Sequence, residues 1–176
     1  MQKKWYMLYT KPKLERKVAS FLDKNGVESF CPLTRKQEQK FRRSRFIDEP
    51  IFDCRIFARL GERDFEILKK ISNIAGILFW RNEFAIIQDD EVEAMKDFCR
   101  HYENIKLEKT AVDIGVPLTF VDDHQYSIDG NTVVIKQLAV KLTLPSVGFI
   151  MTAETESEYG LGKLSANQRK IAKINN

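Results

Sequence analysis

The first hundred residues alternate β-rich runs with helical stripes, and this alternation limits the possible folds more than any other feature of the chain. The run WYMLYT at residues 5–10 is rich in residues that favour strands. Leu14, Val18, Phe21 and Leu22 follow it at i, i+4, i+7, i+8 spacing, which places four apolar side chains on one face of a helix. The chain is therefore expected to open with a strand and a helix that covers it.

Further elements follow in the same manner. β-rich runs predict strands at residues 27–33, 50–60 and 76–80, and the polar stretch at 34–45 predicts a projecting hairpin or loop. Apolar spacing predicts a helix through Phe65, Leu68 and Ile71 and another through Val92, Met95, Cys99 and Tyr102. Asp90 with Glu93 is typical of a capping box at the start of the latter. The order β-α-β-β-α-β-α predicts an α+β fold, in which helices pack on an antiparallel sheet with RNA-recognition-like topology.

The C-terminal part has a different residue pattern. Apolar periodicity lapses at residues 104–112, which we interpret as a linker after a first domain at 1–103. Short β-rich runs then fill residues 113–156, with Asp129-Gly130 as a hairpin-turn signal, and predict five strands in a small β-barrel. Residues 157–176 are polar and predict a loose tail or a marginal helix.

Composition excludes several classes of protein. Hydrophobic residues at 43% and charged residues at 31% are typical of a folded protein, and no apolar stretch reaches the roughly 18 residues of a membrane span. The start of the chain lacks a secretory signal, so we expect a cytoplasmic location without membrane association. Cys31, Cys54 and Cys99 form no Cys-x-x-Cys pair, and His101 and His124 are far apart, so neither a disulfide framework, a metal nor another cofactor is predicted.

Catalytic motifs are also missing. The chain has no phosphate-binding glycine loop, no H-E-x-x-H and no G-x-S-x-G. Asp122 and Asp123 stand beside a predicted turn, where adjacent carboxylates are usually solvated. The sequence therefore predicts a binding protein and not an enzyme.

Charge is distributed unevenly. Residues 1–60 hold 15 Lys and Arg against 7 Asp and Glu, a net charge of +8, whereas the remainder holds 14 against 18, a net charge of −4. Such asymmetry indicates either that the N-terminal part faces a polyanion or that it has a solvated basic surface.

Several segments resemble the NusG family of transcription factors. The opening WYMLYTKPKLERKVASFLDKNGVESFCPL resembles the first β-α-β unit of the NusG N-terminal domain, and PIFDCRIFARL falls where that family has a Pro-Leu-Phe-Pro-Gly-Tyr-Val-Phe-like strand. GILFWRNEFAIIQDDEVEAMKDF resembles the last strand and helix of that domain, particularly in the specialised RfaH and UpxY types that control long polysaccharide operons. NTVVIKQLAVKLTLPSVGFIMTAE resembles the closing strands of the KOW-type barrel.

The resemblance implies a transcription elongation regulator that binds the clamp helices of bacterial RNA polymerase and suppresses pausing or termination. The implied contact residues are Tyr9, Phe57, Trp80 and Val92, although the same side chains could simply form core. Arg55 stands where many relatives carry an aromatic residue of Pro-Gly-Tyr, so the contact is expected to be reshaped there. The barrel lacks the Gly-Pro-Phe loop of a typical KOW motif, which leaves a contact with a ribosomal protein or with Rho open.

Two groups of cations are candidates for binding DNA phosphates. By resemblance, the start of the first helix approaches the non-template strand through Lys11, Lys13 and Arg16. The predicted hairpin lies toward upstream duplex and carries Lys36, Lys40, Arg42, Arg43 and Arg45. Phe41 and Phe46 lie among these cations, where they could stack on bases or anchor the loop. A solvated basic loop is the alternative.

Two other functions compete with this hypothesis. The first is a free-standing RNA-binding module with a ribosome-associated or translational role, since the same topology occurs there, but the sequence contains no RNP motif. The second is a structural assembly protein, which requires a self-complementary apolar face.

Overall fold

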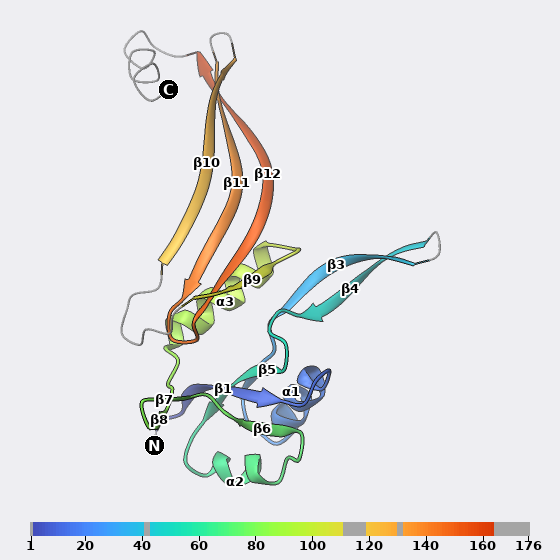
Figure 1. Cartoon of the computed structure of the whole chain (residues 1–176), viewed down its shortest axis with the longest axis vertical. Coiled ribbons are helices and arrows are strands. Elements are labelled where there is room, and N and C mark those ends of the chain that lie inside the picture. The colour runs from blue at the N-terminus through green and yellow to red at the C-terminus, as the bar shows by residue number, and fades with distance from the viewer. Residues whose placement is uncertain (1, 41–42, 111–118, 130–131, 164–176) are drawn as a thin grey trace.

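The computed structural model describes residues 2–40, 43–110, 119–129 and 132–163. Within these ranges, none of the helices combines the length and the apolar character needed to cross a bilayer. Figure 1 shows a body of sheets and helices from which two β arms project.

The N-terminal body is built on a four-stranded antiparallel sheet with strand order β2-β5-β1-β6. Its strands and the first two helices are β1 (Lys4–Thr10), α1 (Glu15–Lys24), β2 (Ser29–Phe30), β5 (Arg55–Leu60), α2 (Asp64–Lys69) and β6 (Ile74–Ile77). This is the strand order of a split β-α-β fold, so the predicted α+β architecture is confirmed. β5 is shorter than the predicted strand at 50–60 because residues 51–54 form a turn in which Cys54 has a φ of 57°.

The two faces of this sheet enter different apolar clusters. Successive residues of a strand point to opposite faces. Leu8 therefore packs with Val18 and Leu22 of α1, whereas Met7 on the other face packs in the cluster that includes Met95. Helices α1 and α2 thus cover one face, and the third helix covers the other.

Two hairpins interrupt the sheet. β3 (Leu33–Lys40) and β4 (Arg43–Pro50) pair in continuous register and project from the body, as predicted for the stretch at 34–45 (Figure 1). β7 (Phe79–Trp80) and β8 (Glu83–Phe84) form a much smaller hairpin after β6. After this small hairpin, Ile87 forms a bridge with Trp5, so the chain rejoins the edge of β1 at Ile87.

The third helix, α3 (Asp89–His101), confirms the helix predicted through Val92 and Met95. The predicted capping box does not form, because Gln88 is the N-cap residue and its side chain makes no capping hydrogen bond. The Asp90 carboxylate instead accepts the N–H of Glu91.

The C-terminal part is a second antiparallel sheet with strand order β10-β11-β12-β9. Its strands are β9 (Lys106–Lys109), β10 (Thr119–Asp129), β11 (Thr132–Leu144) and β12 (Phe149–Lys163). A C-terminal β unit was predicted and is present, but among the described residues its sheet is open, with β10 and β9 as its edges, and not closed into a barrel. The predicted short runs merge into longer strands, because pairing continues through the polar residues between them.

Two boundaries in this region also differ from the sequence prediction. β9 lies within the segment predicted as a linker, because it gains backbone partners in β12 that are distant in sequence. β12 runs to Lys163 by pairing with β11, into the segment predicted as a tail. The predicted turn residue Gly130 lies outside the described residues, as do residues 164–176.

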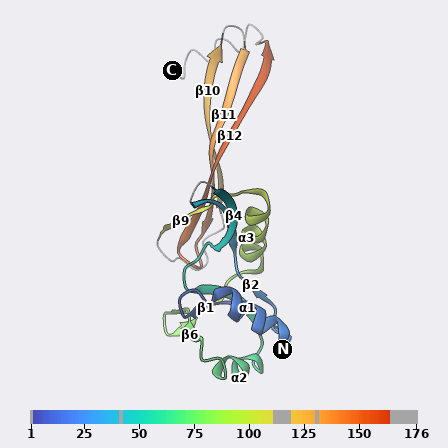
Figure 2. The same ribbon diagram turned by 90° about the vertical axis from the view of Figure 1, so that its right-hand side faces the viewer.

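One apolar cluster joins the two sheets. It contains Phe57 and Met95 of the N-terminal body together with Leu142 and Met151 of the C-terminal sheet. The lower halves of β11 and β12 lie against the body beside α3, and their upper halves extend away from it (Figures 1 and 2). The domain boundary between residue 103 and the predicted linker at 104–112 remains a prediction.

Candidate functional site

Four of the five residues predicted to contact polymerase lie around one apolar cluster. Tyr9 and Arg55 are cross-strand partners, and Phe57 lies on β5 two residues further along. Val92 joins the same cluster from α3, and Tyr9 packs against it. The fifth residue, Trp80, lies outside this cluster on the β7–β8 hairpin.

The members of this group differ in exposure. Phe57 and Val92 are fully buried, because α3 and the C-terminal strands cover that face of the sheet. Tyr9 and Arg55 are half-buried at its margin, whereas Trp80 is 36% exposed. Of the five predicted contact residues, Trp80 is therefore the most exposed.

Arg55 connects the two sheets at the margin of the cluster. Its guanidinium carbon lies 5.7 Å from the centre of the Tyr9 ring and 5.3 Å from that of the Phe149 ring. Its Nη1 donates a hydrogen bond of 3.0 Å to the carbonyl of Asp53, while its buried Nε has no hydrogen-bond partner. The cation that replaces a family aromatic residue is thus held between two rings, which is a favourable cation–π arrangement.

The candidate cations before α1 are arranged around a buried carboxylate. Glu15 is buried and accepts the N–H of Cys54 at 2.8 Å and the N–H of Lys13 at 3.3 Å. Lys13 has a φ of 62°, so Glu15 stabilises a turn in the left-handed region. Lys11, Lys13 and Arg16 are exposed and form no ion pair within the described part of the chain.

The candidate cations of the β3–β4 hairpin are partly neutralised. Lys36 pairs with Glu49 at 3.2 Å, and Arg45 pairs with Glu38 at 2.6 Å across the two strands. Lys40 and Arg43 form the last backbone pair of the hairpin, and Arg42, with Phe41, lies outside the described residues. Phe46 is highly exposed and remains available for stacking.

The β7–β8 hairpin forms a surface that the sequence analysis recognised only through Trp80. We call residues 79–84 the aromatic hairpin. Phe79 and Phe84 are exposed beside Trp80, and Phe84 stacks on Phe65 of α2. The run FWRNEF places aromatic residues on both sides of a short polar segment, and this pattern is the sequence signal that could have indicated this surface.

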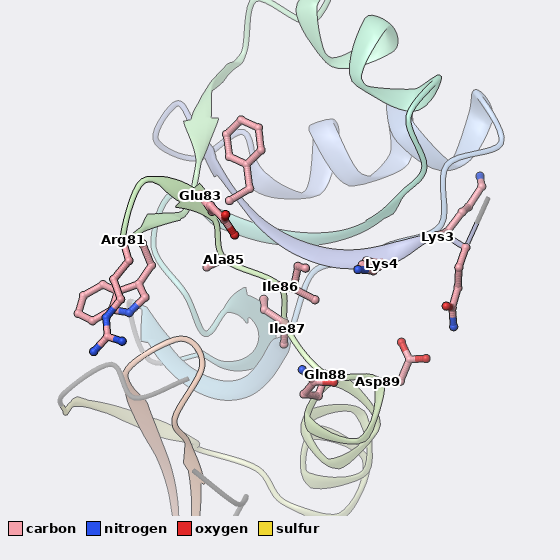
Figure 3. Close-up of a pocket in the computed structure, with 12 residues that line it drawn as sticks. Lys3, Lys4, Arg81, Glu83, Ala85, Ile86, Ile87, Gln88 and Asp89 are labelled. Atoms are coloured by element: carbon pink, nitrogen blue, oxygen red, sulfur yellow. The ribbon is translucent and has the colours of Figure 1, made fainter. Parts of the chain in front are cut away.

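A hollow of about 600 Å³ lies between the aromatic hairpin and the start of β1. Figure 3 shows Arg81 and Lys3 on opposite sides of this hollow, with Ile86 and Ile87 between them. The hollow therefore has an apolar middle and a charged rim.

Three groups that are at least partly buried have raised pKa values. Burial raises the pKa of Cys31 to about 11 and that of Cys99 to about 12, so both thiols stay protonated near neutral pH and are poor nucleophiles. Desolvation also raises the pKa of Glu91, which accepts the Ser146 N–H at 3.1 Å. This buried contact between α3 and the β11–β12 turn was not predicted from the sequence.

No three His, Cys, Asp or Glu side chains among the described residues lie close enough together to hold a metal ion.

Comparison with known proteins identifies the family. The family model described as "Transcription termination factor nusG" matches residues 3–96, more than half of the chain. The chain therefore belongs to the NusG family. It is a transcription factor of the class that acts during elongation, and factors of this class bind RNA polymerase.

The chain is also similar to a solved structure, "Domain interaction in Thermotoga maritima NusG", at 17% sequence identity and a TM-score of 0.43. That similarity covers 92% of this chain and 94% of the other chain. A comparison with curated proteins finds no match.

Proposed function

We propose that this protein is a specialised NusG paralogue of the RfaH or UpxY type, which binds the clamp helices of bacterial RNA polymerase and suppresses pausing or termination on particular operons. It acts in the cytoplasm by binding and not by catalysis. The observation that supports this proposal is the grouping of Tyr9, Arg55, Phe57 and Val92, which come from three separate elements, around one apolar cluster.

The burial of two of these residues restricts how polymerase can contact them. Phe57 and Val92 are fully buried in a cluster to which α3 and the C-terminal sheet both contribute, so a partner reaches their side chains only after the elements packed around them move. Trp80 needs no such movement. The proposal therefore has an accessible part, which contains Trp80, and a covered part, which contains Phe57.

The test is binding of the full-length protein to purified core RNA polymerase, with affinity and melting temperature measured on the same variants. Phe57→Ala should lower the free energy of unfolding by about 3–5 kcal/mol, because a buried ring is removed. Trp80→Ala should instead lower polymerase affinity, by about 2 kcal/mol if the ring is a hot spot, with little change in melting temperature. A wild-type protein that binds structured RNA but not polymerase would support the RNA-binding alternative and contradict the proposal.

We also propose that the projecting hairpin follows DNA phosphates. The variant for this test replaces Lys40, Arg42, Arg43 and Arg45 by Gln. Each lost phosphate contact should reduce the slope of log affinity against log salt by about 0.7–0.9. The matched control replaces Lys69 and Lys70 by Gln, since these two exposed cations lie at the end of α2, away from the hairpin. An unchanged slope in the hairpin variant would show that these cations are solvated and do not contact DNA phosphates.

A further inference from the structure

The aromatic hairpin gathers exposed apolar rings at one end of the sheet. Its three aromatic residues are 56% (Phe79), 36% (Trp80) and 45% (Phe84) exposed. The described residues include only three other exposed large apolar side chains, Phe21, Phe46 and Val121. Half of these exposed side chains therefore lie within six consecutive residues, and all three are accessible with the C-terminal sheet in place.

The turn of this hairpin holds a cation in an unusual backbone conformation. Arg81 and Asn82 have φ values of 49° and 68°, as in a two-residue type I′ turn. Asn tolerates the left-handed region, whereas Arg seldom adopts it. Such residues persist where the surrounding structure fixes them, and they cluster at binding sites.

The rim of the adjacent hollow retains unpaired charge. Lys3 pairs with Asp64 at 3.1 Å, and Asp89 pairs with Arg59 at 3.1 Å. Lys4 and Arg81 form no ion pair within the described part of the chain, and neither does Glu83. The unpaired groups are thus two cations and one carboxylate, which complements an acidic partner.

The ring geometry favours a protein partner over bases. Phe84 stacks on Phe65 at 5.8 Å and meets Phe79 edge to face at 5.7 Å, so these rings already contact one another. Base stacking needs free ring faces in succession, whereas protein side chains need only apolar area and a hollow.

The location of the aromatic hairpin also supports a protein partner over nucleic acid. The hollow contains Lys3 and Lys4, at the start of β1, whereas Lys11, Lys13 and Arg16 follow its end. A seven-residue strand spans roughly 20 Å. The hairpin and the candidate DNA-binding cations before α1 are therefore separate surfaces at opposite ends of β1, which can be occupied at the same time.

We propose that the aromatic hairpin docks a segment of RNA polymerase that carries aliphatic side chains and a carboxylate. The aliphatic side chains enter the hollow beside Trp80 and Phe84, and the carboxylate pairs with Arg81 or Lys4. Trp and Arg are the residue types enriched among interface hot spots. This inference rests on the proposed function and adds a contact that forms while Phe57 is still covered.

The experiment uses the full-length protein, purified core RNA polymerase and a single-stranded oligo-dT probe. Trp80→Ala and Arg81→Glu should each weaken polymerase binding about tenfold or more, with oligo-dT affinity and melting temperature unchanged. Arg81→Lys should restore most of the affinity, because it returns the charge. Phe21→Ala is the matched control, since Phe21 is an exposed aromatic residue of α1, and it should bind as wild type does.

The possible outcomes separate the two proposals. Wild-type binding that is unchanged in both Trp80→Ala and Arg81→Glu overturns the docking surface and removes Trp80 from the proposed contact, but it leaves polymerase binding through the covered part, which contains Phe57, standing. Loss of oligo-dT binding with polymerase binding intact also overturns it and assigns the hairpin to nucleic acid. A wild-type protein without affinity for polymerase overturns both. Arg81→Glu changes an exposed side chain, so it keeps the test decisive if Trp80→Ala lowers the melting temperature.

Discussion

Phe52 joins the two sheets, and its replacement by alanine is expected to lower the free energy of unfolding by about 3–5 kcal/mol. The side chain is fully buried, and its ring meets Phe57 at 5.3 Å and Phe149 at 5.4 Å, both edge to face. Phe57 belongs to the N-terminal sheet and Phe149 to β12, so Phe52→Ala removes ring contacts that hold the two sheets together. At about 2–4 °C per kcal/mol, the melting temperature should fall by about 6–20 °C.

A double-mutant cycle measures the junction itself. Phe52→Leu and Phe149→Leu, made singly and together, should show a coupling of about 0.5–1.5 kcal/mol in urea unfolding followed by circular dichroism. Phe52→Leu combined with Phe21→Leu is the control and should be additive within about 0.5 kcal/mol, because Phe21 is exposed on α1. Additivity of the Phe52 and Phe149 changes, or a loss below about 1 kcal/mol for Phe52→Ala, would refute this account.

Three further predictions concern the domain boundary and the junction. The fragment 1–103 should fold alone and give a dispersed amide NMR spectrum, and undispersed signals would contradict the boundary. Arg55→Tyr removes the cation between Tyr9 and Phe149 but keeps a large side chain, so the fold should persist while polymerase affinity changes; equal affinity would place Arg55 outside the contact. Burial raises the pKa of Glu91, so its contribution to stability is present below the unfolded pKa and is lost as pH rises through the folded pKa. Glu91→Gln should remove this dependence, and parallel curves of melting temperature against pH for the two proteins would show that another group is responsible.

The N-terminal elements could be predicted because their signals are local. The stripe through Val18 and Leu22 forms α1, and the stripe through Val92 and Met95 forms α3. Each stripe repeats at helical spacing and needs no distant partner to be recognised. The grouping of Tyr9, Phe57 and Val92 followed from the family resemblance, which supplied the register.

The remaining features depend on partners far away in the sequence. β9 has the sequence KLEK, which carries no strand signal and becomes a strand only by pairing with β12. The burial of Phe57 in an apolar cluster shared with residues of β11 and β12 is equally non-local. The Arg81-Asn82 turn lacks the glycine that usually marks a two-residue hairpin, so this turn was not predicted.

The burial of β1 on both of its faces has a consequence for how the chain tolerates change. A strand with one solvated face accepts polar substitutions at every second position. In β1, by contrast, all residues from Trp5 to Thr10 are buried or half-buried, with Met7 facing one apolar cluster and Leu8 facing the other. A one-residue insertion would send each side chain into the opposite cluster. We therefore expect residues 5–10 of this strand to tolerate only exchanges that conserve side-chain volume and polarity.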